Sequence, residues 1–402
     1  MQNYDVGIIG AGVAGAFAAL KIAESHKNLK TILFELGHKP AKRRRQLEGW
    51  FGCFPTGDGK LFQGDLDKVL DIANNRSAKA AHKWVSKKLE EVNTSKIIKY
   101  KPPTDATTKE IDKLGFKIEP LDFQQWTPDS IHTLSKNIAD KLEETKNITF
   151  EFDNEVYSLY KRGNDFIIST SNGDFKCKKV ILCAGRSGWR WVNKLYRDLG
   201  ILVSDDVAKF GIRIEISAQY MKQFNKSHFA LHRDDLVVGP FLWGGSVIQE
   251  DHADLTICAF RSNEGRWKSD KVFFSIIKKE KLIDQGTKQT DRIGKLAFLL
   301  SGDRVGREKV KTLIRGESQI SLLPEFSWIN NTLNELSPVI PAIVSRGYFH
   351  CPDIISQTSN INIGNNLETE VDGLFVAGES AGISGILAAA IMGSIAGENI
   401  SK

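Results

Sequence analysis

Short runs of hydrophobic residues near the start of the chain are separated by a glycine-rich turn and a helical pattern. Tyr4 to Ile9 is a short apolar run, and Val13 to Glu24 is rich in Ala and Leu with helical spacing. Thr31 to Phe34 is a second short apolar run. A buried strand, a helix and a second buried strand in this order predict a β-α-β unit.

The pattern is more polar in the next hundred residues. Residues Asp65 to Ile98 are charged with helical spacing, and Lys101-Pro102-Pro103-Thr104 interrupts the pattern. Thr127 is followed by Pro128 and Asp129, which predicts a helix start with a hydroxyl N-cap and an acid at the positive end of the helix dipole. Phe152 to Ala184 predicts a small antiparallel meander that ends in a buried strand.

The second half of the chain changes character and then returns to the first pattern. Strand-like segments such as Phe210 to Ile216 and Leu255 to Phe260 mix with charged helices. Lys278 to Lys281 is a charge run that we interpret as a solvated face. After Pro352 the order is again strand, glycine-rich turn and helix, and Ile383 to Gly397 predicts a buried helix packed closely on a sheet.

This order predicts one nucleotide-binding domain that is assembled from separated stretches and carries an insertion. We expect an α/β fold with a Rossmann-like domain at 1–100, 146–204 and 346–402. A helical cap or connection is expected at 101–145, and a mixed α+β substrate domain at 205–345.

Composition narrows the class of protein only slightly. Of 402 residues, 41% are hydrophobic and 26% charged, which excludes intrinsic disorder and a collagen-like repeat. The net charge of +6 favours an anionic cofactor or substrate without being typical of a nucleic-acid-binding protein.

The five cysteines include no C-x-x-C pair, which predicts free thiols in a reducing compartment. The start of the chain has no basic signal-peptide region, and the apolar run Ile383 to Gly397 is too short for a bilayer, so we expect a cytoplasmic protein without membrane contact.

The sequence Gly10-Ala11-Gly12-Val13-Ala14-Gly15 matches G-x-G-x-x-G directly after a strand and at the start of a helix. Gly10 would permit the tight turn, Gly12 the approach of a pyrophosphate, and Gly15 close packing of helix on strand. Glu35 ends the second strand, where a carboxylate accepts hydroxyl groups of an adenosine ribose. The alternative interpretation is that the glycines form only a tight turn and that Glu35 is an ordinary acid at the end of a strand. The motif by itself does not distinguish binding of FAD from binding of NAD.

A segment near the C-terminus points to FAD. The strand Leu374-Phe375-Val376-Ala377 ends at Gly378-Glu379 and is followed by an Ala-rich helix. This resembles the second flavin-binding motif of glutathione-reductase-type FAD proteins. The resemblance implies that Gly378 and Glu379 hold the ribityl chain, and that the N–H groups of Gly385, Ile386 and Leu387 face the flavin pyrimidine ring.

Other stretches resemble the same family. Val180 to Gly185 looks like its strand followed by A-T-G, with Cys183 departing from the pattern, and implies that Ala184 and Gly185 lie at the cofactor. The stretch from Arg43 to Lys60 resembles the loop around the pyrophosphate and ribityl chain, and Val156 matches a position beside adenine. Further residues assigned to the cofactor on this basis are Ala14, Arg43, Arg44, Arg45, Gly59 and Lys60. A solvated basic patch is the alternative for the arginines, and a plain strand valine for Val156.

More narrowly, the chain resembles the uncharacterised NAD/FAD-utilising dehydrogenases. The residues that carry this resemblance are the Gly52 to Leu61 loop, Arg186-Ser187-Gly188-Trp189, Phe210-Gly211-Ile212-Arg213-Ile214-Glu215 and Leu367-Glu368-Thr369. The resemblance implies FAD and redox chemistry without specifying a substrate.

Cys53 is a candidate nucleophile, with Lys60 as a cation that would favour its thiolate. Its loop resembles the Cys-Asn-Pro stretch of a tRNA-uridine-modifying flavoprotein family, although the long helical C-terminal domain of those enzymes is missing. We favour a packing role for Cys53. His350 precedes Cys351 and Pro352 and is a candidate active-site residue, with a structural histidine as the alternative.

Two other patterns match known functional motifs only in part, and we do not assign those functions to them. Gly378-Glu379-Ser380-Ala381-Gly382 matches the G-x-S-x-G nucleophile elbow of hydrolases, but no His or Asp follows Ser380, as that fold requires. His228 and His232 have i, i+4 spacing without a third ligand pattern, so we predict no metal.

Together these observations predict an FAD-dependent oxidoreductase that moves hydride through flavin N5 and acts on an unidentified small molecule. NADH or NADPH would bind transiently as donor, because a second dinucleotide motif is missing, or electrons would come from the substrate or a partner reductase. The alternatives are a flavin-assisted tRNA-modifying or other nucleic-acid-modifying enzyme that uses Cys53, a flavin monooxygenase, and a flavin-binding protein without catalysis.

Overall fold

The computed structural model describes residues 1–42, 47–92, 96–252, 255–261, 268–355 and 360–401. The chain divides into two compact units. Unit 1 comprises residues 1–97, 123–204 and 357–402, and unit 2 comprises residues 98–122 and 205–356. Compared with the predicted boundaries, residues 123–145 group with unit 1 and residues 346–356 with unit 2.

Unit 1 is built on a sheet in which five strands are parallel, in the order β7-β2-β1-β10-β22. Strands β9 and β8 continue the sheet antiparallel from the first half of β10. The strands of this sheet are β1 (Gln2–Ile9), β2 (Thr31–Phe34), β7 (Ile148–Glu151), β8 (Val156–Arg162), β9 (Asp165–Thr170), β10 (Gly173–Leu182) and β22 (Leu374–Val376). The predicted β-α-β unit and the antiparallel meander are therefore confirmed.

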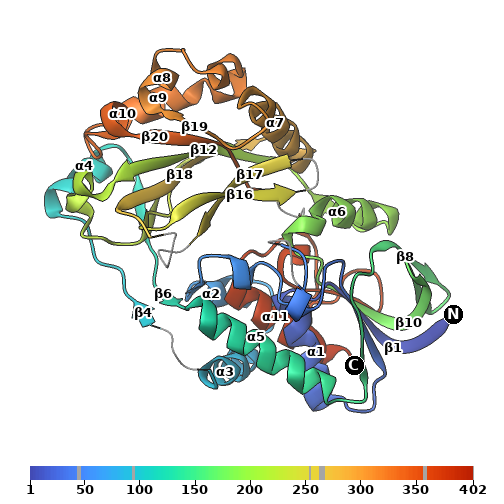
Figure 1. Ribbon diagram of the computed structural model, residues 1–402. Coiled ribbons are helices and arrows are strands. Elements are labelled where there is room, and N and C mark those ends of the chain that lie inside the picture. The colour runs from blue at the N-terminus through green and yellow to red at the C-terminus, as the bar shows by residue number, and fades with distance from the viewer. Residues whose placement is uncertain (43–46, 93–95, 253–254, 262–267, 356–359, 402) are drawn as a thin grey trace. The chain divides into compact units, whose positions relative to one another are not determined.

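Helices α1, α3, α5 and α11 gather on one side of this sheet (Figure 1). The helices of unit 1 are α1 (Val13–Ser25), α2 (Asp65–Leu70), α3 (Asn75–Glu90), α5 (Pro128–Glu143), α6 (Trp189–Asp198) and α11 (Ile386–Asn399). The smaller strands are β3 (Lys60–Phe62), β6 (Phe123–Gln125), β11 (Val203–Ser204) and β21 (Asn360–Ile361), and β4 (Lys96–Ile98) lies where the chain passes between the units. The N-cap predicted at Thr127 is confirmed, because its hydroxyl accepts the Ser130 N–H at 3.2 Å.

Two helical predictions need correction. The stretch Asp65 to Ile98 holds two helices and a strand, because the Asn74 side chain accepts the N–H groups of Arg76 and Ser77 and starts a new helix. The stretch 101–145 contains strands β5 (Lys117–Pro120) and β6 besides α4 (Asp105–Lys113) and α5, so it is not a purely helical connection.

The C-terminal apolar helix is buried as predicted, but its closest packing is against helix α1. A Cβ atom on Gly393 would lie 2.0 Å from the carbonyl oxygen of Ala14, and one on Gly397 would lie 2.7 Å from that of Ala18. The helix starts at Ile386 because Gly382 and Gly385 both adopt positive φ, which ends the preceding turn. Within the described residues, no helix is both long and apolar enough to cross a membrane.

Unit 2 is an α+β structure around an antiparallel sheet, and in its described part the sheet has eight strands. The sheet order is β19-β20-β12-β18-β14-β13-β5, with β15 beside β18. These strands are β12 (Val207–Ser217), β13 (Phe229–Arg233), β14 (Leu236–Val238), β15 (Leu242–Trp243), β18 (Lys271–Lys281), β19 (Gly306–Lys309) and β20 (Tyr348–Ile354). A separate hairpin joins β16 (Ser246–His252) and β17 (Leu255–Arg261).

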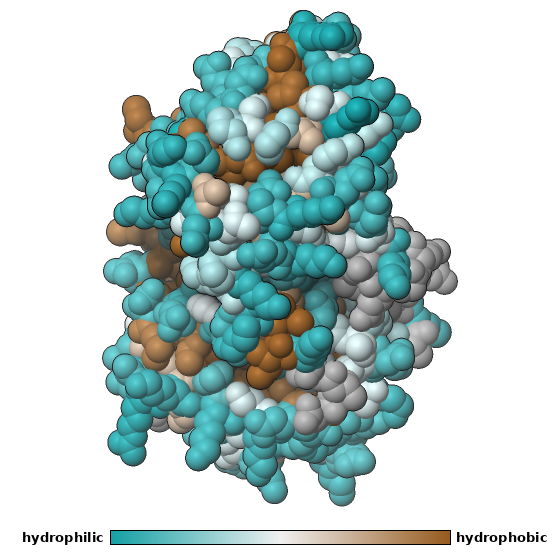
Figure 2. Space-filling view, turned by 90° about the vertical axis from the view of Figure 1, so that its left-hand side faces the viewer, coloured by the Kyte–Doolittle hydropathy of each residue, from teal (hydrophilic) through white to brown (hydrophobic). Residues whose placement is uncertain are grey.

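Besides α4, unit 2 has four helices in its described part, and these lie above the sheet in Figure 1. They are α7 (Gly286–Leu300), α8 (Val310–Ile314), α9 (Trp328–Glu335) and α10 (Ile343–Arg346). Ile212, Ile214 and Ile216 of β12 belong to the apolar core of this unit. The intervening residues of β12 point to the opposite face, because side chains alternate along a strand. On the face of the molecule in Figure 2, hydrophilic residues predominate and hydrophobic residues form separate patches.

We predict that Gly393→Ala lowers the free energy of unfolding by about 2 kcal/mol, because the new methyl group overlaps the Ala14 carbonyl. Urea unfolding followed by circular dichroism measures this change. Gly64→Ala is the matched control, since no atom lies within 4 Å of a Cβ there, and its effect should stay within about 0.5 kcal/mol. Equal stability of the two variants would contradict the packing argument.

Candidate functional site

Four predicted cofactor segments meet at one edge of the sheet in unit 1. Each of them directly follows the carboxyl end of a parallel strand: Gly10 follows β1, Glu35 follows β2, Cys183 follows β10 and Ala377 follows β22. Main-chain hydrogen bonds continue across this edge from Gly10 N to Phe34 O (2.8 Å), from Cys183 N to Ile9 O (2.8 Å) and from Ala377 N to Leu182 O (3.1 Å). The carboxyl ends of parallel strands are where doubly wound sheets bind ligands.

The three glycines of the first turn have different surroundings. Gly10 has φ +99°, and a Cβ there would lie 2.4 Å from the Cys183 carbonyl oxygen. A Cβ on Gly15 would lie 1.9 Å from the Gly10 carbonyl oxygen. Gly12 is different, because the nearest atom to its Cβ position is the Gly52 Cα at 3.9 Å. The fold therefore needs glycine at 10 and 15, whereas at Gly12 the protein itself leaves room for a side chain or a ligand.

Glu35 holds the glycine-rich turn in place. Its Oε2 accepts the Ala11 N–H at 2.8 Å, and its Oε1 accepts the N–H groups of Gly37 at 2.9 Å and Gly49 at 2.8 Å. The residue is buried. The carboxylate predicted for the ribose thus also connects β1, β2 and the loop at Gly49. Because Oε1 already accepts two N–H groups, only Oε2 keeps a further lone pair for a hydroxyl group.

Ser380 connects the third and fourth segments, which follow β10 and β22. Its hydroxyl oxygen accepts the Ala184 N–H at 3.0 Å, and its carbonyl oxygen accepts the hydroxyl of Tyr196. Ser380 is fully buried. Burial raises the pKa of Tyr196 well above its ordinary value, so this phenol stays a donor. The serine of the G-x-S-x-G match therefore has a structural role, in agreement with the rejection of the hydrolase interpretation. Its hydrogen bond to Ala184 holds Ala184 and Gly185 beside the Gly378-Glu379 turn.

The Gly378-Glu379 turn offers an acceptor without a partner. Gly378 has φ +64°, and a Cβ there would touch the Cβ atoms of Ala14 and Ala389 at 3.4 Å. Within the described structure, Oε2 of Glu379 is buried and has no hydrogen-bond partner. A buried carboxylate oxygen without a donor is unfavourable by about 1–3 kcal/mol or more. This atom is suited to accept a ligand hydroxyl, as the flavin-binding resemblance implies.

The helix after this turn begins beside a buried acid that the sequence analysis missed. Gly385 is the N-cap of α11 with φ +128°, followed by Ile386 and Leu387. A Cβ on Gly385 would lie 2.3–2.4 Å from the carboxyl group of Asp65, the first residue of α2. Asp65 is 1% exposed. No sequence signal distinguishes it from an ordinary acid in the first turn of a helix.

The loop with Cys53 runs against the glycine-rich turn. Phe51 N donates to Ala11 O at 2.8 Å, and the Gly52 Cα faces Gly12. Cys53 forms no disulfide and lies half-buried at the start of a short 3-10 helix. A direct contact of Cys53 with a cofactor stays a prediction.

The end of the same loop is ordered by backbone contacts and an ion pair. Lys60 is buried, and its Nζ donates to Asp58 Oδ2 at 2.9 Å. Gly59 has φ +67°, with Trp126 O 2.3 Å from its Cβ position. Lys60 therefore carries a neutralising partner within its own loop, and its predicted catalytic and cofactor roles are not tested.

For two groups of residues that were predicted to bind the cofactor, the structure gives no contact that tests the prediction. Arg43, Arg44 and Arg45 lie outside the described residues. Val156 begins β8, is half-buried and pairs with Thr170. Their cofactor roles stay predictions.

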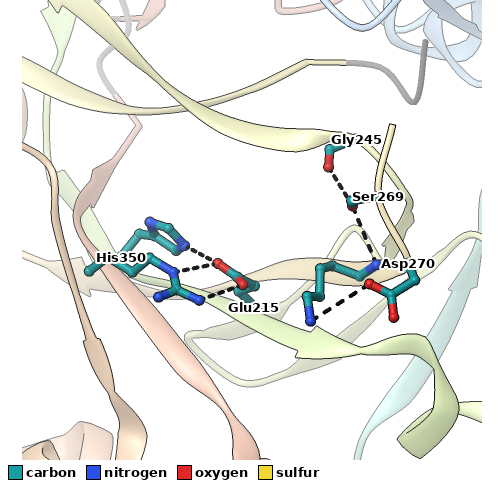
Figure 3. Close-up of polar contacts among 7 residues, drawn as sticks. Glu215, Gly245, Ser269, Asp270 and His350 are labelled. Carbon is teal, nitrogen blue, oxygen red and sulfur yellow. Dashed lines mark hydrogen bonds and ion pairs between the residues drawn. The ribbon is translucent and has the colours of Figure 1, made fainter. Parts of the chain in front are cut away.

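The sheet of unit 2 carries a buried polar cluster on the face opposite its helices (Figure 3). The Glu215 carboxylate accepts Arg307 Nη2 at 2.8 Å and Nε at 2.9 Å, and His350 Nε2 lies 2.9 Å from the same carboxylate. The Arg307 guanidinium is 3.7 Å from the ring centroid of Tyr348. Burial acts to raise the pKa of Glu215, but the hydrogen bonds from Arg307 and His350 outweigh it and lower the pKa to about 2.

A second buried ion pair lies on the neighbouring strands. Arg213 Nε donates to Asp353 Oδ2 at 3.0 Å, and Ser275 Oγ donates to the same oxygen at 2.6 Å. The sequence pattern placed Arg213 and Glu215 in a family-like stretch, and His350 was a candidate by itself. Only the antiparallel register of β12 with β20 brings them together. A carboxylate that orients an imidazole is a common arrangement for proton transfer.

Metal-ligand geometry does not appear in the described part of the chain, where no three His, Cys, Asp or Glu side chains gather. His232 instead pairs with Glu119 at 2.5 Å. All five cysteines lie within the described ranges, and none of them forms a disulfide.

Comparison with known proteins adds one family match. The model of the family described as "Glucose inhibited division protein A" matches residues 340–402, which include β20, β22, the Gly378-Glu379 turn and α11. Among curated proteins, no sequence match is found.

Similar solved structures are numerous and distant in sequence. They include glycine oxidase from Geobacillus kaustophilus (12% identity, TM-score 0.45, covering 100% of this chain and 95% of the oxidase). L-proline dehydrogenase from P. horikoshii has 14% identity and a TM-score of 0.45, with 99% and 93% covered. A p-nitrophenol 4-monooxygenase from Pseudomonas putida DLL-E4 has 8% identity and a TM-score of 0.42, with 95% and 73% covered.

The strand order and the strand–turn–helix segments of unit 1 define its fold class. A parallel sheet that opens with β1, the G-x-G-x-x-G turn and α1 is the Rossmann-like α/β arrangement of FAD-binding proteins. The predicted α/β fold class with a second, α+β unit is confirmed. The glutathione-reductase subtype stays a prediction.

We predict that the Glu215 cluster makes unit 2 acid-sensitive. Because the folded-state pKa of about 2 lies below the ordinary 4.5, the contribution of Glu215 is complete above about pH 4.5 and is lost as the pH falls towards 2. Glu215→Gln should remove this dependence and lower the free energy of unfolding by about 1–2 kcal/mol at pH 7, because the exposed Arg307 stays solvated when it loses its anion. Urea unfolding at a series of pH values measures both effects. A variant as stable as the wild type at pH 7 would contradict the importance of the cluster.

Proposed function

We propose that this protein is an FAD-dependent oxidoreductase that moves hydride through flavin N5 and acts on a small molecule. The observation that carries the proposal is the buried Glu379 oxygen without a partner, at the same sheet edge as the open position at Gly12. An unfilled acceptor and a gap at the glycine-rich turn are suited to a dinucleotide with a polyhydroxyl chain.

The residues of this edge fit the separate parts of FAD. The start of α1 behind Gly12 would bind the pyrophosphate, because the N–H groups and the dipole of a helix N-terminus favour anions. Glu35 would accept ribose hydroxyls, and Glu379 a ribityl hydroxyl. The start of α11 would place its positive end at the pyrimidine ring. When bound, the flavin supplies an acceptor or donor of hydride.

The family match supports the same assignment. It covers β22, the Gly378-Glu379 turn and α11, the segment on which the FAD assignment most depends. Ala184, Gly185 and Ala14 lie against that turn through Ser380 and Gly378. The electron donor in this proposal is NADH or NADPH, bound transiently, or a partner reductase.

The purified protein should be yellow, and heat denaturation should release FAD in about equimolar amount. A visible absorption spectrum followed by chromatography of the released cofactor measures this. Anaerobic addition of NADH and NADPH then identifies a donor by bleaching. A colourless protein that also fails to bind added FAD would contradict the proposal.

We predict that Gly12→Ala lowers FAD affinity at least tenfold with little loss of stability. The φ of −64° suits alanine, and its Cβ meets no protein atom closer than 3.9 Å, so the methyl group would obstruct only a ligand. Glu35→Gln should weaken FAD binding less. Fluorescence titration of apoprotein with FAD and urea unfolding measure the two quantities. Gly12→Ala protein with wild-type affinity would show that the pyrophosphate does not approach this turn.

The second candidate, nucleic-acid modification through Cys53, rests on the half-buried thiol beside the glycine-rich turn. It requires a covalent adduct between Cys53 and a base. We expect no adduct when the holoenzyme is incubated with total tRNA and examined by intact mass spectrometry. An adduct in the wild type that disappears in Cys53→Ser would favour this function over the first.

A further inference from the structure

Asp65 occupies an unusual position for an acidic side chain. It is the first residue of α2 and is 1% exposed, with its carboxyl group directly on Gly385 at the start of α11. A side chain at position 385 would overlap both carboxyl oxygens at 2.3–2.4 Å. The positive φ of +128° at Gly385 and the absence of a Cβ therefore together admit the carboxyl group to this helix end.

Only half of this carboxyl group has a partner. Oδ1 accepts Lys68 Nζ at 2.9 Å, and the same Nζ also donates to Ser384 O at 3.1 Å. Oδ2 is buried and makes no hydrogen bond within the described structure. The N–H groups of Leu387 and Ala388 at the start of α11 also act as donors towards this carboxyl group. Neither of them makes a hydrogen bond of normal geometry to Oδ2, so this oxygen keeps acceptor capacity.

The energetics indicate that the missing partner is a hydrogen-bond donor. Burial raises the pKa of Asp65, while Lys68 and the N–H groups of Ala388 and Leu387 oppose the rise. In either protonation state at least one carboxyl lone pair remains to be satisfied. An orphaned buried acceptor is unfavourable, and a donor on a bound ligand would remove that cost.

The pyrimidine edge of a flavin is a three-point pattern of acceptor, donor and acceptor: C2=O, the imide N3–H and C4=O. The N-terminus of a helix supplies only donors, so it serves a carbonyl oxygen and cannot serve the imide N–H. A carboxyl oxygen beside the same helix end supplies the acceptor that the helix lacks.

We propose that Asp65 is a direct ligand of the flavin, accepting the imide N3–H through Oδ2 while the start of α11 serves a neighbouring carbonyl group. This inference rests on the proposed function and adds a recognition residue to it. It also selects among flavins, since an N3-substituted flavin would not provide this donor.

Affinity for a flavin that lacks the imide proton tests the proposal. Apoprotein is titrated separately with FAD and with 3-methyl-FAD, and the ratio of the two dissociation constants is compared between variants. The wild type should favour FAD at least tenfold, and Asp65→Ala should bring the ratio close to one. Asp67→Ala, an exposed acid on the same helix, is the matched control and should keep the wild-type ratio. A wild type without preference, or an unchanged ratio in Asp65→Ala, would overturn the proposal.

An isosteric variant covers the case in which Asp65→Ala does not fold. In Asp65→Asn the negative charge is removed, so the imide proton of bound FAD should ionise at a pH about one unit lower than in the wild type. Alkaline titration of the flavin absorption spectrum measures this pKa. An unchanged pKa would contradict a direct contact. If the wild type binds neither flavin, the proposed function fails before this question arises, so the two failures are distinguishable.

Discussion

The close approach of α1 and α11 is the constraint on which unit 1 depends. The two helices belong to opposite ends of the chain, and they approach so closely that glycine is required where α11 passes the carbonyl groups of Ala14 and Ala18. Since α1 follows β1 and α11 follows β22, this packing brings two helix N-termini to the same sheet edge. Two positive helix ends beside one set of strand ends favour the binding of an anionic group at this edge, in line with the proposed dinucleotide.

The buried polar groups around this edge fall into two kinds. Glu35 and Ser380 have protein partners, and they fix the turns relative to one another. Glu379 and Asp65 each keep one buried oxygen without a partner. Folded proteins satisfy nearly all buried polar atoms, so two such oxygens beside the start of α11 support the proposed binding site.

Unit 2 uses its polar groups differently. The core of its sheet lies under the helices, while the other face carries Glu215 between Arg307 and His350 and, beside it, the Arg213–Asp353 pair. These charges are mutually compensated, and the low pKa of Glu215 follows from that compensation. The arrangement fixes the orientation of the His350 imidazole, which gives this face one side chain capable of proton transfer.

The sequence by itself determined the local elements of unit 1, including the turns that meet at one edge of its sheet. A strand, a G-x-G-x-x-G turn and a helix are encoded within about twenty-five residues, so periodicity and glycine spacing were sufficient to place β1, α1 and β2. The turn at Gly378 was recognisable for the same reason. Boundaries were less certain where capping decides them, as at Asn74, and the packing partner of α11 was predicted as the sheet although it is α1.

The tertiary structure alone decided which distant residues meet. Asp65 lies on Gly385 because α2 packs against α11, and no local pattern records a contact over 320 positions. Likewise, Glu215 meets Arg307 and His350 through the register of three antiparallel strands that are far apart in the sequence. Local propensity fixes where a strand or helix forms, whereas burial and hydrogen-bond satisfaction across the whole fold select the side chains that complete a site.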